Sequence, residues 1–99
     1  MGRCLKEKSG GSVRNVLADP KGSIFAEHHA TGSHGPPKTF LVEGVGKGDI
    51  PGCMDFSLVD EVFTVADDDA FTMCRTLAQS DGILAGGSAG MNVFAAVQV

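Results

Sequence analysis

The chain has 99 residues, of which 42% are hydrophobic and 20% charged, a composition that predicts one small globular domain and argues against disorder. Its formal net charge is −4 and its eight basic residues form no cluster, which argues against nucleic acid as a partner. No apolar stretch approaches the ~20 residues of a membrane span, and three widely spaced cysteines predict no disulfide framework.

The first half of the chain alternates short regular elements with loops. Residues Arg3–Lys8 predict the end of a helix, because basic side chains favour a helix C-terminus and a glycine pair follows. The apolar and β-branched run Val13–Ala18 predicts a buried strand that ends at an Asp-Pro turn. Residues 21–38, with three histidines and a proline pair, predict a loop with one helical turn at Ile24–Glu27.

A loop rich in glycine occupies Val42–Pro51. Three glycines in five residues permit positive φ angles and a close approach of the backbone to a ligand. After this loop, Ser57 is predicted to cap a single helical turn through Asp60, and Val62–Val65 predicts a short strand. The loop is therefore the first candidate for a segment that contacts a ligand.

A longer helix is predicted from Asp67 onwards, with Asp67 as its N-cap, because apolar or small residues then recur on one helical face. Gly82 follows as a typical C-terminal glycine. Ile83–Ala85 predicts a third strand, and a turn at Gly86–Gly90 leads into a helix of small residues that continues to Val99. Strands that alternate with helical patterns predict an α/β fold with short parallel strands and flanking helices.

The Gly86–Gly90 turn matches G-x-S-x-G, the nucleophile elbow of α/β-hydrolases, and exposes Ser88 beside the free N–H groups of a helix N-terminus. In that fold an acid and then a histidine follow the serine, but the residues after Gly90 include no Asp, Glu or His. A serine hydrolase is therefore disfavoured. A plain strand-to-helix connection remains an alternative.

Two further ligand patterns are incomplete. The histidines His28, His29 and His34 have no cysteine or carboxylate partner at recognised ligand spacing, so we expect no metal site. The segment around Gly44 and Gly46 has Asp49 where a dinucleotide fingerprint requires glycine. Neither a metal nor a dinucleotide is therefore expected.

Three motifs stand in order along the chain: VEGVGKGDIP at Val42–Pro51, SLVDEV at Ser57–Val62 and GILAGGSAG at Gly82–Gly90. Together they resemble the cystathionine β-synthase and cysteine synthase family of fold type II pyridoxal-phosphate enzymes, over a span from about Arg3 to Val99. The resemblance implies that residues 1–99 form part of the family's catalytic domain, truncated at both ends. It also implies pyridoxal 5′-phosphate as the cofactor.

The resemblance assigns site residues by matching positions. Ser88 corresponds to the serine that hydrogen-bonds the pyridine nitrogen, with Gly87 beside it, and a neutral hydroxyl there suits β-replacement rather than transamination. The family glycines that pass close to cofactor and substrate correspond to Gly44 and Gly46. The residues expected near the substrate are Glu43 and Lys47, of which Lys47 replaces a tyrosine of the animal cystathionine β-synthases.

The same resemblance places the Schiff-base lysine and the phosphate-binding loop outside this chain. No residue here is therefore expected to be catalytic, and the isolated chain is expected to be inactive. The expected parent reaction is the condensation of serine with homocysteine to cystathionine. Cysteine synthesis from an activated serine and sulfide, or a non-catalytic truncated remnant, are the alternatives.

The expected partners are small amino-acid substrates and the missing part of the catalytic domain or a full-length protomer. The family implies a homodimeric parent enzyme. Unpaired cysteines are typical of a reduced compartment, so a cytoplasmic location is expected.

Overall fold

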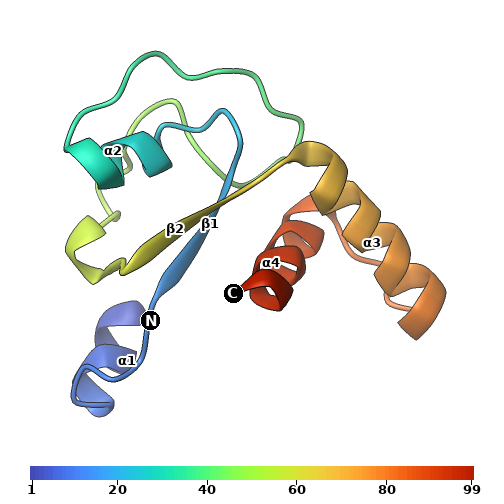
Figure 1. The fold of residues 1–99 in the computed structure, drawn as a ribbon, viewed down its shortest axis with the longest axis horizontal. Helices are drawn as coiled ribbons and strands as arrows, with labels where there is room; N and C mark the ends of the chain where they lie inside the picture. Colours follow the sequence, from blue (N-terminus) through green and yellow to red (C-terminus); the bar gives the residue numbers. More distant parts are fainter.

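The computed structural model describes residues 1–99, which form a flat α/β structure with a central pair of strands (Figure 1). In chain order the elements are α1 (Gly2–Lys8), β1 (Val16–Pro20), α2 (Phe25–Thr31), the 3₁₀ helix η1 (Phe56–Leu58), β2 (Glu61–Val65), α3 (Asp67–Asp81) and α4 (Gly87–Gln98). None of the helices combines the length and the apolar character that a membrane-spanning segment needs. The α/β class with short parallel strands and flanking helices is confirmed.

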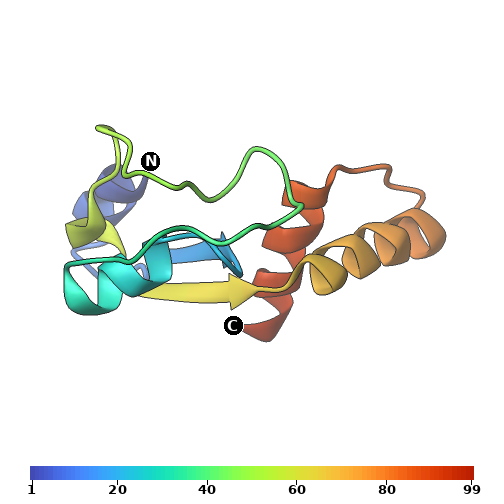
Figure 2. The same ribbon diagram turned by 90° about the horizontal axis from the view of Figure 1, so that it is seen from above.

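The two strands pair in parallel, in a register that joins Val16 to Glu61 and Pro20 to Val65. Their carboxyl ends point toward α3 and the start of α4, while the long loop between α2 and η1 runs along one face of the strands (Figure 2). This arrangement gathers the loop, the strand ends and a helix N-terminus in one region. In open parallel sheets such a region is the usual place for a ligand.

The first strand, β1, lies later in the sequence than the expected Val13–Ala18. The strand begins at Val16, because Asn15 and the residues just before it are held in polar contacts with other segments. It also includes Asp19 and Pro20, which were predicted to end it. Proline is tolerated there because it closes the strand, and Lys21 N–H makes the next bond, to the Val65 carbonyl oxygen at 2.8 Å.

The third predicted strand, Ile83–Ala85, is wrong: these residues form an irregular connection between α3 and α4. The sheet consists of β1 and β2 alone, so no neighbouring backbone pairs with this segment. Leu84 is 93% exposed as a result. An apolar run becomes a strand only where another strand supplies hydrogen-bond partners.

Three helix predictions also need correction. The turn expected at Ile24–Glu27 is the helix α2, which ends where Gly32 takes a positive φ of 76°. Ser57 does not cap its turn; Asp55 does, by accepting hydrogen bonds from the N–H and hydroxyl of Ser57. Asp67 is the first residue of α3 rather than its cap, because its carboxylate is engaged elsewhere.

The boundaries of two other helices match the sequence. The predicted N-terminal helix is α1, and α3 ends at Gly82, which has the left-handed φ of 69° expected of a C-terminal glycine. Both predictions rested on signals that lie within a few residues of the helix end. Such signals act locally and do not depend on the rest of the fold.

The core is small and lies where α3 and α4 meet the strands. Its buried hydrophobic residues are Val42, Val65, Ala70, Met91 and Ala95. Gly90 allows the two helices to approach closely, because a Cβ at this position would collide with the Ala70 carbonyl oxygen and with Cys74 Sγ. The predicted turn at Gly86–Gly90 is thus the first turn of α4, which begins at Gly87 after the N-cap Gly86, and it serves the packing of the helix as well as the site described below.

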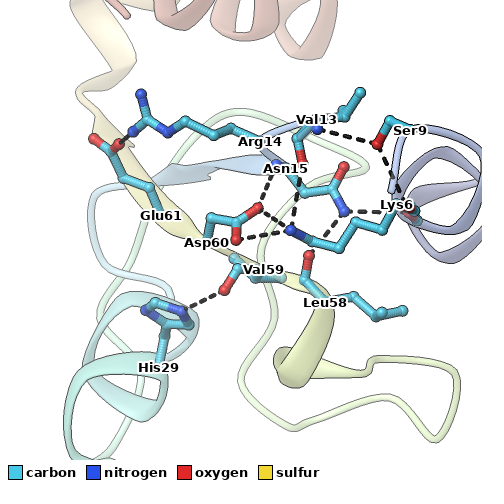
Figure 3. A network of polar contacts seen from close by, with 11 residues as sticks. Lys6, Ser9, Val13, Arg14, Asn15, His29, Leu58, Val59, Asp60 and Glu61 are labelled. Carbon is cyan, nitrogen blue, oxygen red and sulfur yellow. Dashed lines mark hydrogen bonds and ion pairs between the residues drawn. The ribbon is translucent and has the colours of Figure 1, made fainter. Parts of the chain in front are cut away.

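A polar network connects α1 to the amino-terminal end of the sheet (Figure 3). Asp60 accepts hydrogen bonds from the Asn15 N–H at 2.6 Å and from Lys6 Nζ at 2.8 Å. The Asn15 side chain donates to the Leu58 carbonyl oxygen at 2.8 Å, and Arg14 forms an ion pair with Glu61. These contacts join α1 to the beginnings of both strands and so fix the register of the sheet.

Candidate functional site

Two neighbouring hollows bring the sequence-predicted site residues together. The first hollow has a volume of about 510 Å³ and is lined by Leu41, Glu43, Gly44, Phe71, Gly86, Gly87 and Ser88. The second hollow, of about 360 Å³, shares Gly44 with the first and is also lined by Gly46 and Lys47. All six residues predicted to lie near cofactor or substrate thus line one of two hollows joined at Gly44.

One wall of the first hollow is the N-terminus of α4. Ala89 and Gly90 donate their N–H groups to the Gly86 carbonyl oxygen, at 3.0 and 3.2 Å. The N–H groups of Gly87 and Ser88 have no backbone partner, as is usual for the first residues of a helix. The wall therefore offers two N–H donors and the hydroxyl of Ser88 to a polar ligand.

The Ser88 side chain is half-buried and its hydroxyl forms no hydrogen bond within the chain. The backbone of Ser88 is fixed from the other side, because its carbonyl oxygen accepts a hydrogen bond from Asn92 Nδ2 at 2.8 Å. A hydroxyl both donates and accepts hydrogen bonds. Ser88 can accordingly bind either a ring nitrogen or a hydroxyl of a ligand.

The segment before Ser88 packs against α3. A Cβ at Gly87 would lie 2.9 Å from a ring carbon of Phe71, so this position is restricted to glycine unless the ring moves. Cys74 Sγ donates to the Gly86 carbonyl oxygen at 3.2 Å. These two side chains of α3 set the position of the turn.

The loop around Glu43 and Gly44 forms the other wall. Val42, 2% exposed, anchors the start of the loop in the core, and Glu43 next to it is exposed in the hollow. Gly44 has a φ of 77° and open space where a Cβ would stand. The backbone at Gly44 can therefore pass directly along a bound ligand.

Gly46 and Lys47 continue this wall into the second hollow. Gly46 has a φ of 61°, and a Cβ there would collide with Pro20 and press on Phe40. The backbone of Lys47 is held on both sides by the turn after β1: its N–H donates to Ser23 Oγ and its carbonyl oxygen accepts from the Ile24 N–H, both at 3.3 Å. The Lys47 side chain remains exposed beside the hollow.

Two aspartates near these walls were missed as contributors. Asp67, predicted as a helix cap, accepts hydrogen bonds from the backbone of Leu41 and Val42 in the loop wall. Asp19, predicted as a turn residue, is 1% exposed at the end of β1 and accepts from the Ala26 N–H at 3.2 Å, while its Oδ1 has no partner. For Asp19, the sequence offered one signal of a supporting role, namely an acid at the end of an apolar strand. For Asp67, it offered no such signal.

Burial raises the pKa of the Asp19 carboxyl above its ordinary value, and hydrogen bonds from Ser23 and Ala26 oppose this rise. Ser23, which hydrogen-bonds the Asp19 carboxylate, also accepts a hydrogen bond from the Lys47 N–H through its Oγ. Asp19 lines neither hollow. It belongs to the support of the site rather than to its surface.

The three histidines lie away from both hollows. His29 Nε2 bonds the Val59 carbonyl oxygen at 2.9 Å, and the His28 ring packs 4.9 Å from the ring of Phe56, centroid to centroid. No group of three or more His, Cys, Asp or Glu side chains is arranged to hold a metal ion. No histidine therefore faces Ser88 as a general base would.

Comparison with known proteins gives a match along the whole chain. The profile of the family described as pyridoxal-phosphate dependent enzyme matches residues 1–99. The O-acetylserine dependent cystathionine beta-synthase of Bacillus subtilis (strain 168) is 37% identical over 94 residues, which is 95% of this chain and 28% of that protein. The cystathionine beta-synthases of Rattus norvegicus and Oryctolagus cuniculus are 38% and 40% identical over 96 residues, which is 97% of this chain and 17% of each. The chain thus spans less than a third of the length of these relatives.

Proposed function

The chain belongs to the family of pyridoxal-phosphate dependent enzymes, and we propose that its two hollows form the side of the cofactor and substrate site that faces the pyridine ring. Enzymes of this family bind pyridoxal 5′-phosphate, which supplies an electron sink for reactions of amino acids. The observation that carries the proposal is the convergence of Ser88, Gly87 and Gly44 on the first hollow.

The residues of the first hollow fit a planar, polar ring. Its volume of about 510 Å³ is in the range of pockets that hold small molecules. The Ser88 hydroxyl is free to bond a ring nitrogen, and Gly44 presents bare backbone rather than a side chain. In this arrangement Ser88 would hold the ring by its nitrogen, and the loop wall at Gly44 would limit its position.

The chemistry of Ser88 favours one class of reaction. A carboxylate beside a pyridine nitrogen would hold that nitrogen protonated, whereas a neutral hydroxyl does not. The weaker electron withdrawal that results favours replacement at the β-carbon of an amino acid over transamination. We infer a β-replacement enzyme of sulfur amino-acid metabolism, acting on small amino-acid substrates.

Within this class, the condensation of serine with homocysteine to cystathionine is the preferred reaction, in keeping with the names of the rat and rabbit relatives. The name of the Bacillus relative specifies O-acetylserine, which is an activated serine. Cysteine synthesis from an activated serine and sulfide is therefore the second candidate. Glu43 and Lys47, on the loop wall, are the residues proposed to face the substrates.

We further propose that the working protein is a cytoplasmic homodimer in which the rest of the catalytic domain completes the site. A non-catalytic remnant is the remaining alternative. The two active candidates are separated by their products. The assay uses the full-length protein, in which the rest of the catalytic domain is present. Serine with homocysteine should give cystathionine, and O-acetylserine with sulfide should give cysteine, both measured by mass spectrometry; the absence of both products from that protein would leave the remnant.

The role of Ser88 is tested by Ser88→Ala in the full-length protein, which supplies the rest of the catalytic domain, reconstituted with pyridoxal 5′-phosphate. We expect the cofactor affinity or the rate of β-replacement to fall at least about tenfold, because one hydrogen bond to the ring is lost. Ser80→Ala is the matched control, since Ser80 is exposed on α3 and bonds only to its own helix and its neighbour. Equal binding and equal rates in the two variants would refute the assignment of Ser88.

A further inference from the structure

One helix, α3, holds both walls of the first hollow. Its first residue, Asp67, holds the loop wall: Oδ1 accepts from the N–H groups of Leu41 at 3.0 Å and Val42 at 3.2 Å, and Oδ2 also accepts from Leu41 at 3.0 Å. The next two residues of that loop are Glu43 and Gly44, which line the hollow. Asp67 thus binds Val42, the residue directly before Glu43 in the wall.

The opposite wall is held farther along the same helix. Phe71 packs against Gly87, and Cys74 Sγ donates to the Gly86 carbonyl oxygen at 3.2 Å. Because an α-helix is a rigid element with a rise of ~1.5 Å per residue, these contacts fix the spacing of the two walls. The width of the hollow is therefore set by α3.

We propose that Asp67 is a positioning residue, whose carboxylate fixes Leu41 and Val42 to the start of α3 and so holds Glu43 and Gly44 across from Ser88. A carboxylate is well suited to this task, because hydrogen bonds to a charged acceptor are stronger than neutral ones. Asp67 does not cap its own helix, in which the Ala70 N–H bonds the Ala66 carbonyl oxygen instead. The neighbouring Asp69 is exposed and makes no such contact.

The loop depends on contacts at its ends because two of its central residues are glycines. Gly44 and Gly46 both have positive φ angles, and glycine gives the backbone more freedom than other residues. The far end of the wall is held at Lys47 by Ser23 and Ile24. With Asp67 in place, only the short segment 43–46 lies between two fixed points.

The first test measures the anchor itself, without cofactor. In Asp67→Ala we expect amide hydrogen exchange in a peptide that covers Leu41 and Val42 to become at least about tenfold faster, since the acceptor of both N–H groups is gone. Asp67→Asn retains one carbonyl oxygen and should give an intermediate rate. Asp69→Ala, the matched control, should leave this peptide unchanged, and peptides of α3 should show that each variant is folded. Unchanged exchange in Asp67→Ala would overturn the inference.

The second test measures the consequence, which rests on the proposed function. In the protein loaded with pyridoxal 5′-phosphate, Asp67→Ala should raise KM for the amino-acid substrate about tenfold and change kcat by less than about threefold, because binding rather than chemistry is disturbed. Asp67→Asn should restore part of the KM. An unchanged KM in an active Asp67→Ala protein would refute the positioning role. These kinetics are measured in the full-length protein, which contains the rest of the catalytic domain. Absence of turnover in its unmodified form would refute the proposed function, and the exchange rates would then decide the inference by themselves.

Discussion

At the scale of single residues, the proposed site is lined by backbone groups as much as by side chains. Ser88 contributes a hydroxyl, but Gly44, Gly46 and Gly87 contribute the absence of a Cβ. Each of these glycines either takes a positive φ or lies where a Cβ would crowd a neighbour. The supporting aspartates Asp19 and Asp67 act on backbone N–H groups in turn.

Asp19 gives a prediction for the dependence of stability on pH. Burial raises its pKa, so the folded state holds the proton more tightly than the unfolded state does. The stability that the protonated carboxyl contributes is present below the ordinary pKa of 3.8 and is lost as the pH rises through the raised value. In Asp19→Asn this loss should disappear, because the amide keeps an acceptor for the Ala26 N–H and carries no charge.

The measurement is the free energy of unfolding in urea, for both proteins, at a series of pH values from 3.5 to neutral. We expect the free energy of unfolding of Asp19→Asn to increase relative to that of the unmodified chain as the pH rises. Asp69→Asn provides the control, because it removes a carboxylate that is exposed. A difference that stays constant with pH would show that burial does not shift the titration of Asp19.

The single-residue contributions were predictable only where the signal is local. The sequence motif around Ser88 indicated a helix N-terminus, and the glycine density of Val42–Pro51 indicated a loop with positive φ angles, which Gly44 and Gly46 adopt. Asp67 could not be predicted, since its partners lie 25 and 26 residues earlier and an acid at a helix start has a sufficient local explanation. The contact exists only because the loop returns to α3 in three dimensions.

At the scale of elements, helices were easier to predict than strands. The ends of α1 and α3 follow from basic and glycine residues near them in the sequence. Ile83–Ala85 has the composition of a strand but forms none, because no edge of the β1–β2 pair reaches it. A strand depends on a partner that its own residues do not specify.

The polar network at the start of the sheet gives a prediction at this scale. The hydrogen bond from Lys6, followed by that from the Asn15 N–H, lowers the pKa of Asp60 below its ordinary value of 3.8. The network therefore stabilises the fold above that value, and its contribution is lost as the pH falls through the lowered pKa. Asp60→Asn should be less stable at neutral pH and should lose less stability on acidification.

Urea unfolding followed by circular dichroism, at neutral pH and at a series of acid pH values, measures both effects. Asp69→Asn makes the same substitution at an exposed position and should behave like the unmodified chain. Amide hydrogen exchange at falling pH shows which segments open first. If α1 and the start of β1 exchange before the rest of the structure, the result would support the role of Asp60 in holding them together. Identical acid titrations for Asp60→Asn and the unmodified chain would contradict it.

At the scale of the whole molecule, the chain has a small core and an open apolar surface. Its five-residue core cluster lies between α3, α4 and the strands, while Ile83, Leu84 and Val97 are more than half exposed. A domain of this size has a stability at the low end of the usual range, about 5 kcal/mol. Single core contacts therefore matter more here than in a larger protein.

Met91 allows this to be tested, because it is fully buried at 0% exposure in the core between the two helices. Met91→Ala removes a large side chain from a site that cannot collapse without moving α4, and such substitutions cost about 2–5 kcal/mol. The loss is about 40–100% of that stability, so we expect the urea midpoint of unfolding to fall by at least about 40%. Leu84→Ala should change the free energy of unfolding by less than about 0.5 kcal/mol, because Leu84 is 93% exposed. Urea unfolding followed by circular dichroism compares the two, and equal losses would mean that the core between α3 and α4 does not hold the fold together.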